Sequence, residues 1–84
     1  MGTYGQEIAV AMAVQIDAEL GARGWSRVDL AKLVGMSTSS IYRYLDGERQ
    51  MKLQDIADIA DALGLSYLEL ATRVQRRLDG QDVR

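Results

Sequence analysis

Apolar residues recur along this chain at spacings of three and four, which is the period of an α-helix. Near the N-terminus Ile8, Met12, Ile16 and Leu20 follow one another at steps of four, with alanines beside them. Such a stripe forms one face of a helix of about four turns. Because two glycines interrupt the pattern at its end, we expect this helix over residues 5–21.

Capping residues mark the next two helices. Ser26 can accept a hydrogen bond from an unpaired backbone amide, and Asp29 stands three residues later, as a capping box requires. Ser37 is the next candidate cap, and an Asp-Gly pair closes the segment that follows it. The pattern predicts helices over residues 27–34 and 38–45.

Two further helices complete the pattern. The first, over residues 53–63, has one apolar face made of Leu53, Ile56, Ala57, Ala60 and Leu63. Ser66 and Glu69 then have capping-box spacing and open a helix over residues 67–78. The polar residues 79–84 read as a tail that frays.

The length of 84 residues suits one small domain, which we place at residues 1–78. Val, Ile and Thr are never arranged in the alternation that a strand requires, so the sequence predicts an all-α fold of five helices.

Composition narrows the possible functions. Cys and His are absent, which excludes disulfides, Cys/His zinc sites and thiol or imidazole catalysis. No glycine-rich phosphate loop is present either, so we expect neither an enzyme nor a bound cofactor or metal. The longest apolar run, Ile8–Val14, has seven residues, whereas a membrane span needs ~20. We therefore expect a soluble cytoplasmic protein with no membrane partner.

Charge is unevenly distributed, although the net charge is only −2. Residues 1–22 hold three acidic residues and no base, residues 23–52 hold six bases and three acids, and residues 53–84 hold four bases and six acids. A local basic surface can attract an anion whatever the net charge. Charges scattered over a solvated surface would give the same counts, and both interpretations remain open.

The turn between the second and third helices carries the functional signal. The two short helices are joined by only three residues, Val34–Met36. Because this connection is so short, the helices must meet at a steep angle. Gly35 falls where positive φ is expected, and the small Ala31 falls where the helices cross. This is the arrangement of a helix-turn-helix, whose second helix enters the major groove of DNA.

These residues resemble a known family. Leu30–Gly47 is similar to the helix-turn-helix of phage lambda-type repressors and Cro/Xre-type regulators, and Leu53–Ser66 resembles the fourth helix of that family. The resemblance covers about residues 8 to 70 and implies a five-helix lambda-repressor-like DNA-binding domain.

The resemblance also implies roles for individual side chains. Thr38, Ser39 and Arg43 would read base edges, Arg43 through the two acceptors of a guanine. The residues expected on the DNA backbone or groove wall are Arg27, Ser40, Tyr42, Arg49 and Lys52. Thr38 and Ser39 would also suit a helix start, and Arg27, Arg49 and Lys52 could be ordinary solvated charges.

The chain departs from the family at two places. Met51 and Lys52 stand where the fourth helix usually begins with Pro and then Ser or Thr. Asp46 stands where the family often has Asn bonding a phosphate. A carboxylate repels a phosphate, so we expect that contact to be lost or the Asp46 side chain to turn away.

The last helix has more apolar surface than it needs to pack on its own core. This favours a homodimer formed through the last helix, to which the first helix could also contribute. The predicted dimer residues are Tyr67, Leu68, Ala71, Val74 and Leu78. The alternative is that these residues only close the core.

We therefore expect a sequence-specific binder of double-stranded DNA, most simply a phage or bacterial transcriptional repressor acting as a homodimer. The alternative is an antitoxin-type or other interaction module that uses the same fold to bind a protein partner.

Overall fold

The computed structural model describes residues 3–83, and these residues form five α-helices and no strand. The helices are α1 (Thr3–Arg23), α2 (Arg27–Val34), α3 (Thr38–Leu45), α4 (Leu53–Ala62) and α5 (Tyr67–Val83). The all-α prediction is therefore confirmed. No helix within residues 3–83 is both long enough and apolar enough to cross a membrane.

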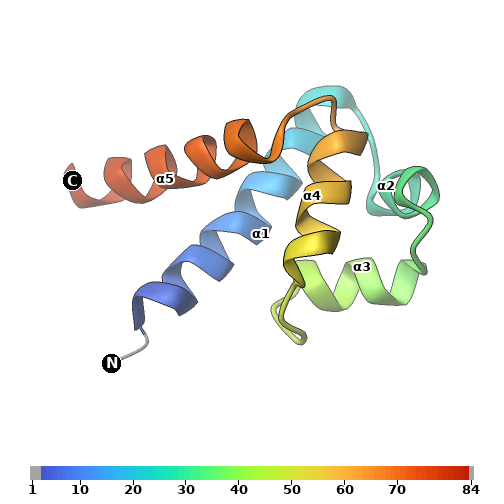
Figure 1. The fold of residues 1–84 in the computed structure, drawn as a ribbon, viewed down its shortest axis with the longest axis horizontal. Helices are drawn as coiled ribbons and strands as arrows, with labels where there is room; N and C mark the ends of the chain where they lie inside the picture. Colours follow the sequence, from blue (N-terminus) through green and yellow to red (C-terminus); the bar gives the residue numbers. More distant parts are fainter. Residues whose placement is uncertain (1–2, 84) are drawn as a thin grey trace.

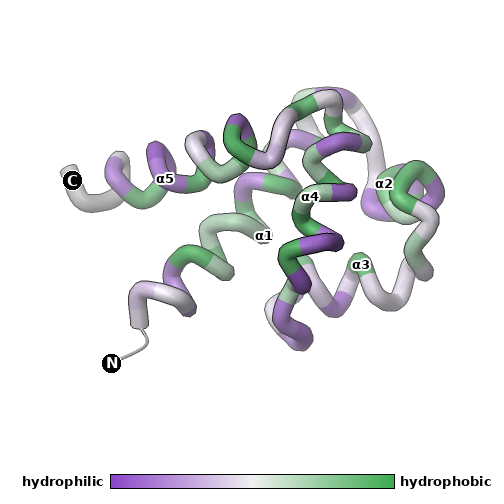
Figure 2. Tube along the Cα trace, viewed as in Figure 1, coloured by the Kyte–Doolittle hydropathy of each residue, from purple (hydrophilic) through white to green (hydrophobic). Residues whose placement is uncertain are grey.

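The helices separate into two sides (Figure 1). The long helices α1 and α5 extend toward one side, where both ends of the chain lie, and α2 and α3 lie on the other. Between them stands α4, along which hydrophobic and hydrophilic residues alternate (Figure 2). The shape leaves α3 at the edge of the molecule, away from the chain ends.

One core joins all five helices. Its largest fully buried side chains are Ile16, Leu30, Ile41, Ile59 and Leu70, one from each helix in turn. Burying an aliphatic side chain of this size contributes ~1.5–3 kcal/mol. Each helix is thus held in place by an apolar anchor of its own.

Local hydrogen bonds set the starts of three helices. Ser26 Oγ accepts from the Asp29 N–H at 3.1 Å, and the Ser26 N–H donates to Asp29 Oδ2 at 2.8 Å. Ser66 and Glu69 repeat this reciprocal pair at 3.0 and 2.9 Å. Ser37 Oγ caps α3 by accepting from a backbone N–H at 3.1 Å. The capping predictions are confirmed.

The last helix is longer than predicted. It continues past Leu78 to Val83, over residues expected to be a frayed tail; Arg84 lies outside the described residues. The Gln75 amide donates to Asp79 Oδ1 at 3.0 Å, one turn further along the helix. Side-chain pairs at this spacing stabilise a helix. Polarity alone was therefore a poor signal for the end of α5.

Candidate nucleic-acid interface

The turn between α2 and α3 has the predicted geometry. Gly35 adopts φ +77°, the left-handed conformation that side chains disfavour. Its N–H donates to the Ala31 carbonyl at 2.9 Å, and the Met36 N–H donates to the same oxygen at 3.0 Å. These two bonds end α2 and redirect the chain at once. Ala31, which is 2% exposed, packs in the core beside them.

Helix α3 has one buried face and one exposed face. Ile41, Tyr44 and Leu45 are buried. The exposed residues are Thr38, Ser39, Tyr42 and Arg43. The helix lies at the edge of the molecule (Figure 1), and its outer face is open to solvent.

The three predicted base readers share this exposed face. Within residues 3–83, the Arg43 side chain makes no hydrogen bond or ion pair. Thr38 and Ser39 are exposed in the first turn of α3, and no side-chain hydrogen bond is found for either among the described residues. Ser40 is only half exposed, and its Oγ accepts from Ser37 Oγ at 2.9 Å. The outer face is therefore polar and its donors are free.

Of the six bases in residues 23–52, two are neutralised within the molecule. Arg23 pairs with Glu19, and Arg27 pairs with two aspartates. The bases without an ion pair to any described residue are Lys32, Arg43, Arg49 and Lys52. Three of these four lie on α3 or in the segment that follows it. Positive charge is thus available beside the exposed face of α3.

Arg27 lies at the start of α2 and contacts three other parts of the fold. Its Nε and one terminal nitrogen donate to the two carboxylate oxygens of Asp17 at 3.1 and 2.7 Å. Its other terminal nitrogen donates to Asp46 Oδ1 at 2.8 Å. The Arg27 Cζ lies 5.0 Å from the centroid of the Tyr42 ring. Hydrogen bonds from Asp17 and then Asp46 raise the pKa of Arg27 above its already high usual value.

We expected Asp46 either to lose the phosphate contact or to turn its side chain away. In the structure the Asp46 carboxylate is turned toward Arg27. Asp17 was not singled out from the sequence. It lies in α1, ten residues before Arg27, and no local pattern relates the two. Only the packing of α1 beside α2 brings them together.

The segment after α3 positions two more candidate backbone contacts. Arg49 is exposed and its Cζ lies 6.0 Å from the centroid of the Tyr44 ring, and Lys52 is exposed at the N-cap of α4. The Tyr44 hydroxyl donates to Asp55 Oδ2 at 2.5 Å. This hydrogen bond, helped by burial, raises the pKa of Tyr44. Tyr44 is therefore a core residue and not part of the exposed face.

The five predicted dimer residues differ in how far they are exposed. Val74 is 3% exposed and belongs to the core of the single chain, so it offers little surface to a second molecule. Leu78 packs against the core and Ala71 is half exposed. Of the five predicted dimer residues, Tyr67 and Leu68 are the most exposed, at 46% and 71%, and Leu78 lines the groove described below. Leu70 and Val74 of α5 are buried because they complete the core between α5 and α1.

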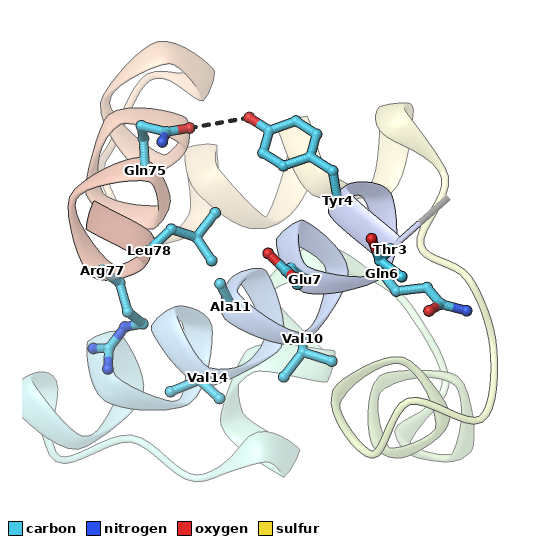
Figure 3. Close-up of a pocket in the computed structure, with 10 residues that line it drawn as sticks. All are labelled: Thr3, Tyr4, Gln6, Glu7, Val10, Ala11, Val14, Gln75, Arg77 and Leu78. Carbon is cyan, nitrogen blue, oxygen red and sulfur yellow. Dashed lines mark hydrogen bonds between the residues drawn. The ribbon is translucent and has the colours of Figure 1, made fainter. Parts of the chain in front are cut away.

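A groove between α1 and α5, with a volume of about 630 Å³ and both apolar and polar side chains in its lining, was not predicted from the sequence (Figure 3). Ala11 and Leu78 face each other across it, and the Tyr4 hydroxyl donates to Gln75 Oε1 at 3.4 Å near one end. Val10 and Val14 line it while exposing 65% and 45% of their surface. The unbroken apolar run Ile8–Val14 was the available signal, since a helix apolar on more than one face has more than one surface to bury.

Comparison with protein families agrees with this geometry. A family described as a helix-turn-helix domain matches residues 11–77, which include all of α2, α3 and α4. No curated protein and no solved structure gave a match. Because the family match spans most of the chain and the turn, cap and exposed helix are all in place, the chain belongs to the helix-turn-helix domain family.

Proposed function

We propose that this protein is a sequence-specific regulator that binds double-stranded DNA, most simply a phage or bacterial repressor of the Cro/Xre type. The observation that carries this proposal is the outer face of α3. It is exposed, it is polar, and Arg43 makes no ion pair with any described residue. Helix-turn-helix proteins place such a face in the major groove.

Each side chain has a distinct role in this proposal. Arg43 donates to the N7 and O6 acceptors of a guanine, which is the commonest base-specific contact in the major groove. Thr38 and Ser39 contact neighbouring base edges from the first turn of α3. Arg49 and Lys52 neutralise phosphates beside the groove, where they fix the register of the protein on the duplex.

We also propose that two copies bind one operator. A single recognition helix reads few base pairs, and paired half-sites about one DNA turn apart overcome this limit. The exposed Val10 and Val14 line the groove between α1 and α5 together with the predicted dimer residue Leu78, so we place the dimer contact there and not at Tyr67 and Leu68. Sedimentation should show that Val10→Glu dissociates the dimer and that Leu68→Glu does not. The reverse result would return the contact to the start of α5.

The proposed activity is binding without catalysis, in the cytoplasm at the nucleoid. The test is selection from a random duplex pool with purified protein, followed by sequencing of the retained DNA. A two-fold symmetric motif with centres about one turn apart is the expected result. Binding should also weaken with salt, with a log–log slope near −0.9 for each phosphate neutralised.

Arg43→Ala tests the proposed recognition face directly. The variant should bind the selected duplex on the order of 10- to 100-fold less tightly, as loss of a bidentate base contact predicts. It should lose much less affinity for random DNA. Lys32→Ala removes an exposed charge from α2 instead and is the matched control. Equal losses on both duplexes would refute the role of Arg43.

A protein partner is the second candidate function, and the groove between α1 and α5 is the observation that favours it. No enrichment of any duplex at low salt would exclude the DNA-binding proposal. An antitoxin-type interaction module would then be the better hypothesis, with the groove as the surface to test.

A further inference from the structure

Arg27 is the base nearest in sequence to the start of α2, yet its surroundings are unfavourable for a phosphate. Asp17 and Asp46 both lie within hydrogen-bond distance of its guanidinium. Two negative charges therefore surround one positive charge, and the cluster of Arg27, Asp17 and Asp46 has a net charge of −1. Such a cluster repels an approaching phosphate.

The guanidinium also has few donors left. It has five N–H groups in all, and Asp17 and Asp46 take three of them. The Arg27 side chain is only 22% exposed, which further limits its access to a ligand. Both its charge and its donors are thus directed toward the protein.

The remaining contact of Arg27 is with the recognition helix. Its guanidinium carbon lies 5.0 Å from the centre of the Tyr42 ring, a distance at which a cation attracts the face of an aromatic ring. Tyr42 is 43% exposed and lies on the outer face of α3 with Ser39 and Arg43. Asp17 holds the guanidinium from α1 and Asp46 holds it from the end of α3, so its orientation against the ring is fixed from two sides.

We propose that Arg27 is a positioning residue for DNA recognition, which acts by holding the Tyr42 ring in one orientation and not by binding phosphate. This inference rests on the proposed DNA-binding function. Tyr42 then meets the groove as an ordered apolar surface, suited to the methyl group of a thymine. The Asp46 carboxylate would be unfavourable beside a phosphate. In this arrangement it instead orients the Arg27 guanidinium toward the Tyr42 ring.

Arg27→Lys separates the two roles because it keeps the charge. A lysine binds a phosphate as a point charge, but it cannot grip two carboxylates and stack on a ring at once. The measurement is fluorescence anisotropy with a selected duplex and a random duplex over a range of salt concentrations. Arg76→Lys, the same change at an exposed position of α5, is the matched control and should alter neither affinity.

If Arg27 positions Tyr42, Arg27→Lys should weaken binding of the selected duplex by about two- to fivefold, the range that a cation–ring contact gives. Affinity for random DNA and the salt slope should not change. Tyr42→Leu should weaken selective binding as well, and Arg27→Lys should add nothing in the Tyr42→Leu background. Tyr42→Leu alters an exposed side chain, so it keeps the test valid if Arg27→Lys proves poorly folded.

Three results would overturn the inference. Unchanged selective binding by Arg27→Lys would show that charge alone suffices, as for a phosphate contact. Independent, multiplicative losses from the two substitutions would show that Arg27 does not act through Tyr42. Failure of the unmodified protein to bind either duplex would refute the proposed function itself, and is distinguishable because no variant is needed to see it.

Discussion

Glu19 is the one buried charged residue among the residues whose burial the structure describes, and its replacement gives a quantitative test of the fold. The side chain is 5% exposed and lies between α1 and α5. Its carboxylate accepts from Arg23 at 2.8 Å, from Arg73 at 2.7 Å and from Gln15 at 2.7 Å. Three of the roughly four lone-pair sites of the carboxylate thus accept a hydrogen bond from a side-chain donor.

The size of the effect follows from the pKa of Glu19. Burial raises this pKa, but the hydrogen bonds from Arg73, Arg23 and Gln15 together outweigh burial and lower it from 4.5 to about 2. A difference of 2.5 units corresponds to about 3 kcal/mol of folding free energy. Because the folded pKa is the lower one, this stabilisation is present above pH 4.5 and is lost as the pH falls toward about 2.

Glu19→Gln removes the charge and keeps the shape. At neutral pH the variant should lose about 3 kcal/mol of unfolding free energy, since two guanidinium groups are left without their shared carboxylate. The assay is urea unfolding followed by circular dichroism, at neutral pH and through the acidic range. The unmodified protein should lose stability below pH 4.5, and the variant should lack that part of the decline.

Glu48→Gln is the matched control, because Glu48 is exposed, lies outside the groove between α1 and α5, and has no ion pair with a described residue. It should change stability by no more than the ~0.2–1 kcal/mol of an exposed charge contact. A loss from Glu19→Gln that is equally small, with an unchanged acidic decline, would refute the reasoning.

Four further substitutions test the local structure by the same unfolding assay. Gly35→Ala should cost about 1–2 kcal/mol because φ is +77°. Gly21→Ala, within α1 and with open space around it, should instead be neutral or stabilise by up to ~1 kcal/mol, and a similar loss at both positions would contradict the argument. Ser26→Ala should cost ~1 kcal/mol through loss of the cap on α2, and an unchanged midpoint would show that the cap is not needed. Tyr44→Phe should cost about 1 kcal/mol of unfolding free energy through loss of its hydrogen bond to Asp55. In an ultraviolet titration the variant should lack the tyrosine whose pKa is raised above the usual value. If that tyrosine ionisation were still present, it would belong to another tyrosine.

The sequence was most informative where structure is set by neighbours in the chain. Ser26 and Asp29 lie one helical turn apart, so their reciprocal hydrogen bonds form within a single turn. Gly35 takes its conformation from the lack of a side chain. The starts of α2, α3 and α5 were therefore predicted at the residues where the structure has them, and α4, which has no side-chain cap, also begins at the predicted Leu53.

The exposed face of α3 was also largely determined by sequence. Ile41 and Leu45 are four residues apart and both turn toward the core, which leaves Thr38, Ser39 and Arg43 outside. A helix of known extent with two apolar anchors has little freedom in its rotation. The candidate base readers themselves were named from the family resemblance, and all three are exposed in the structure.

Tertiary structure alone decided which charges are free and which apolar surface is open. Arg27 and Asp46 are nineteen residues apart, and Glu19 and Arg73 are fifty-four apart, so no local pattern relates either pair. Val74 and Val10 look alike in sequence, yet the first is buried by α1 while the second is exposed beside the groove. The physical reason is that helix periodicity fixes which residues share a face, whereas the crossing of α1 and α5 determines which face is covered.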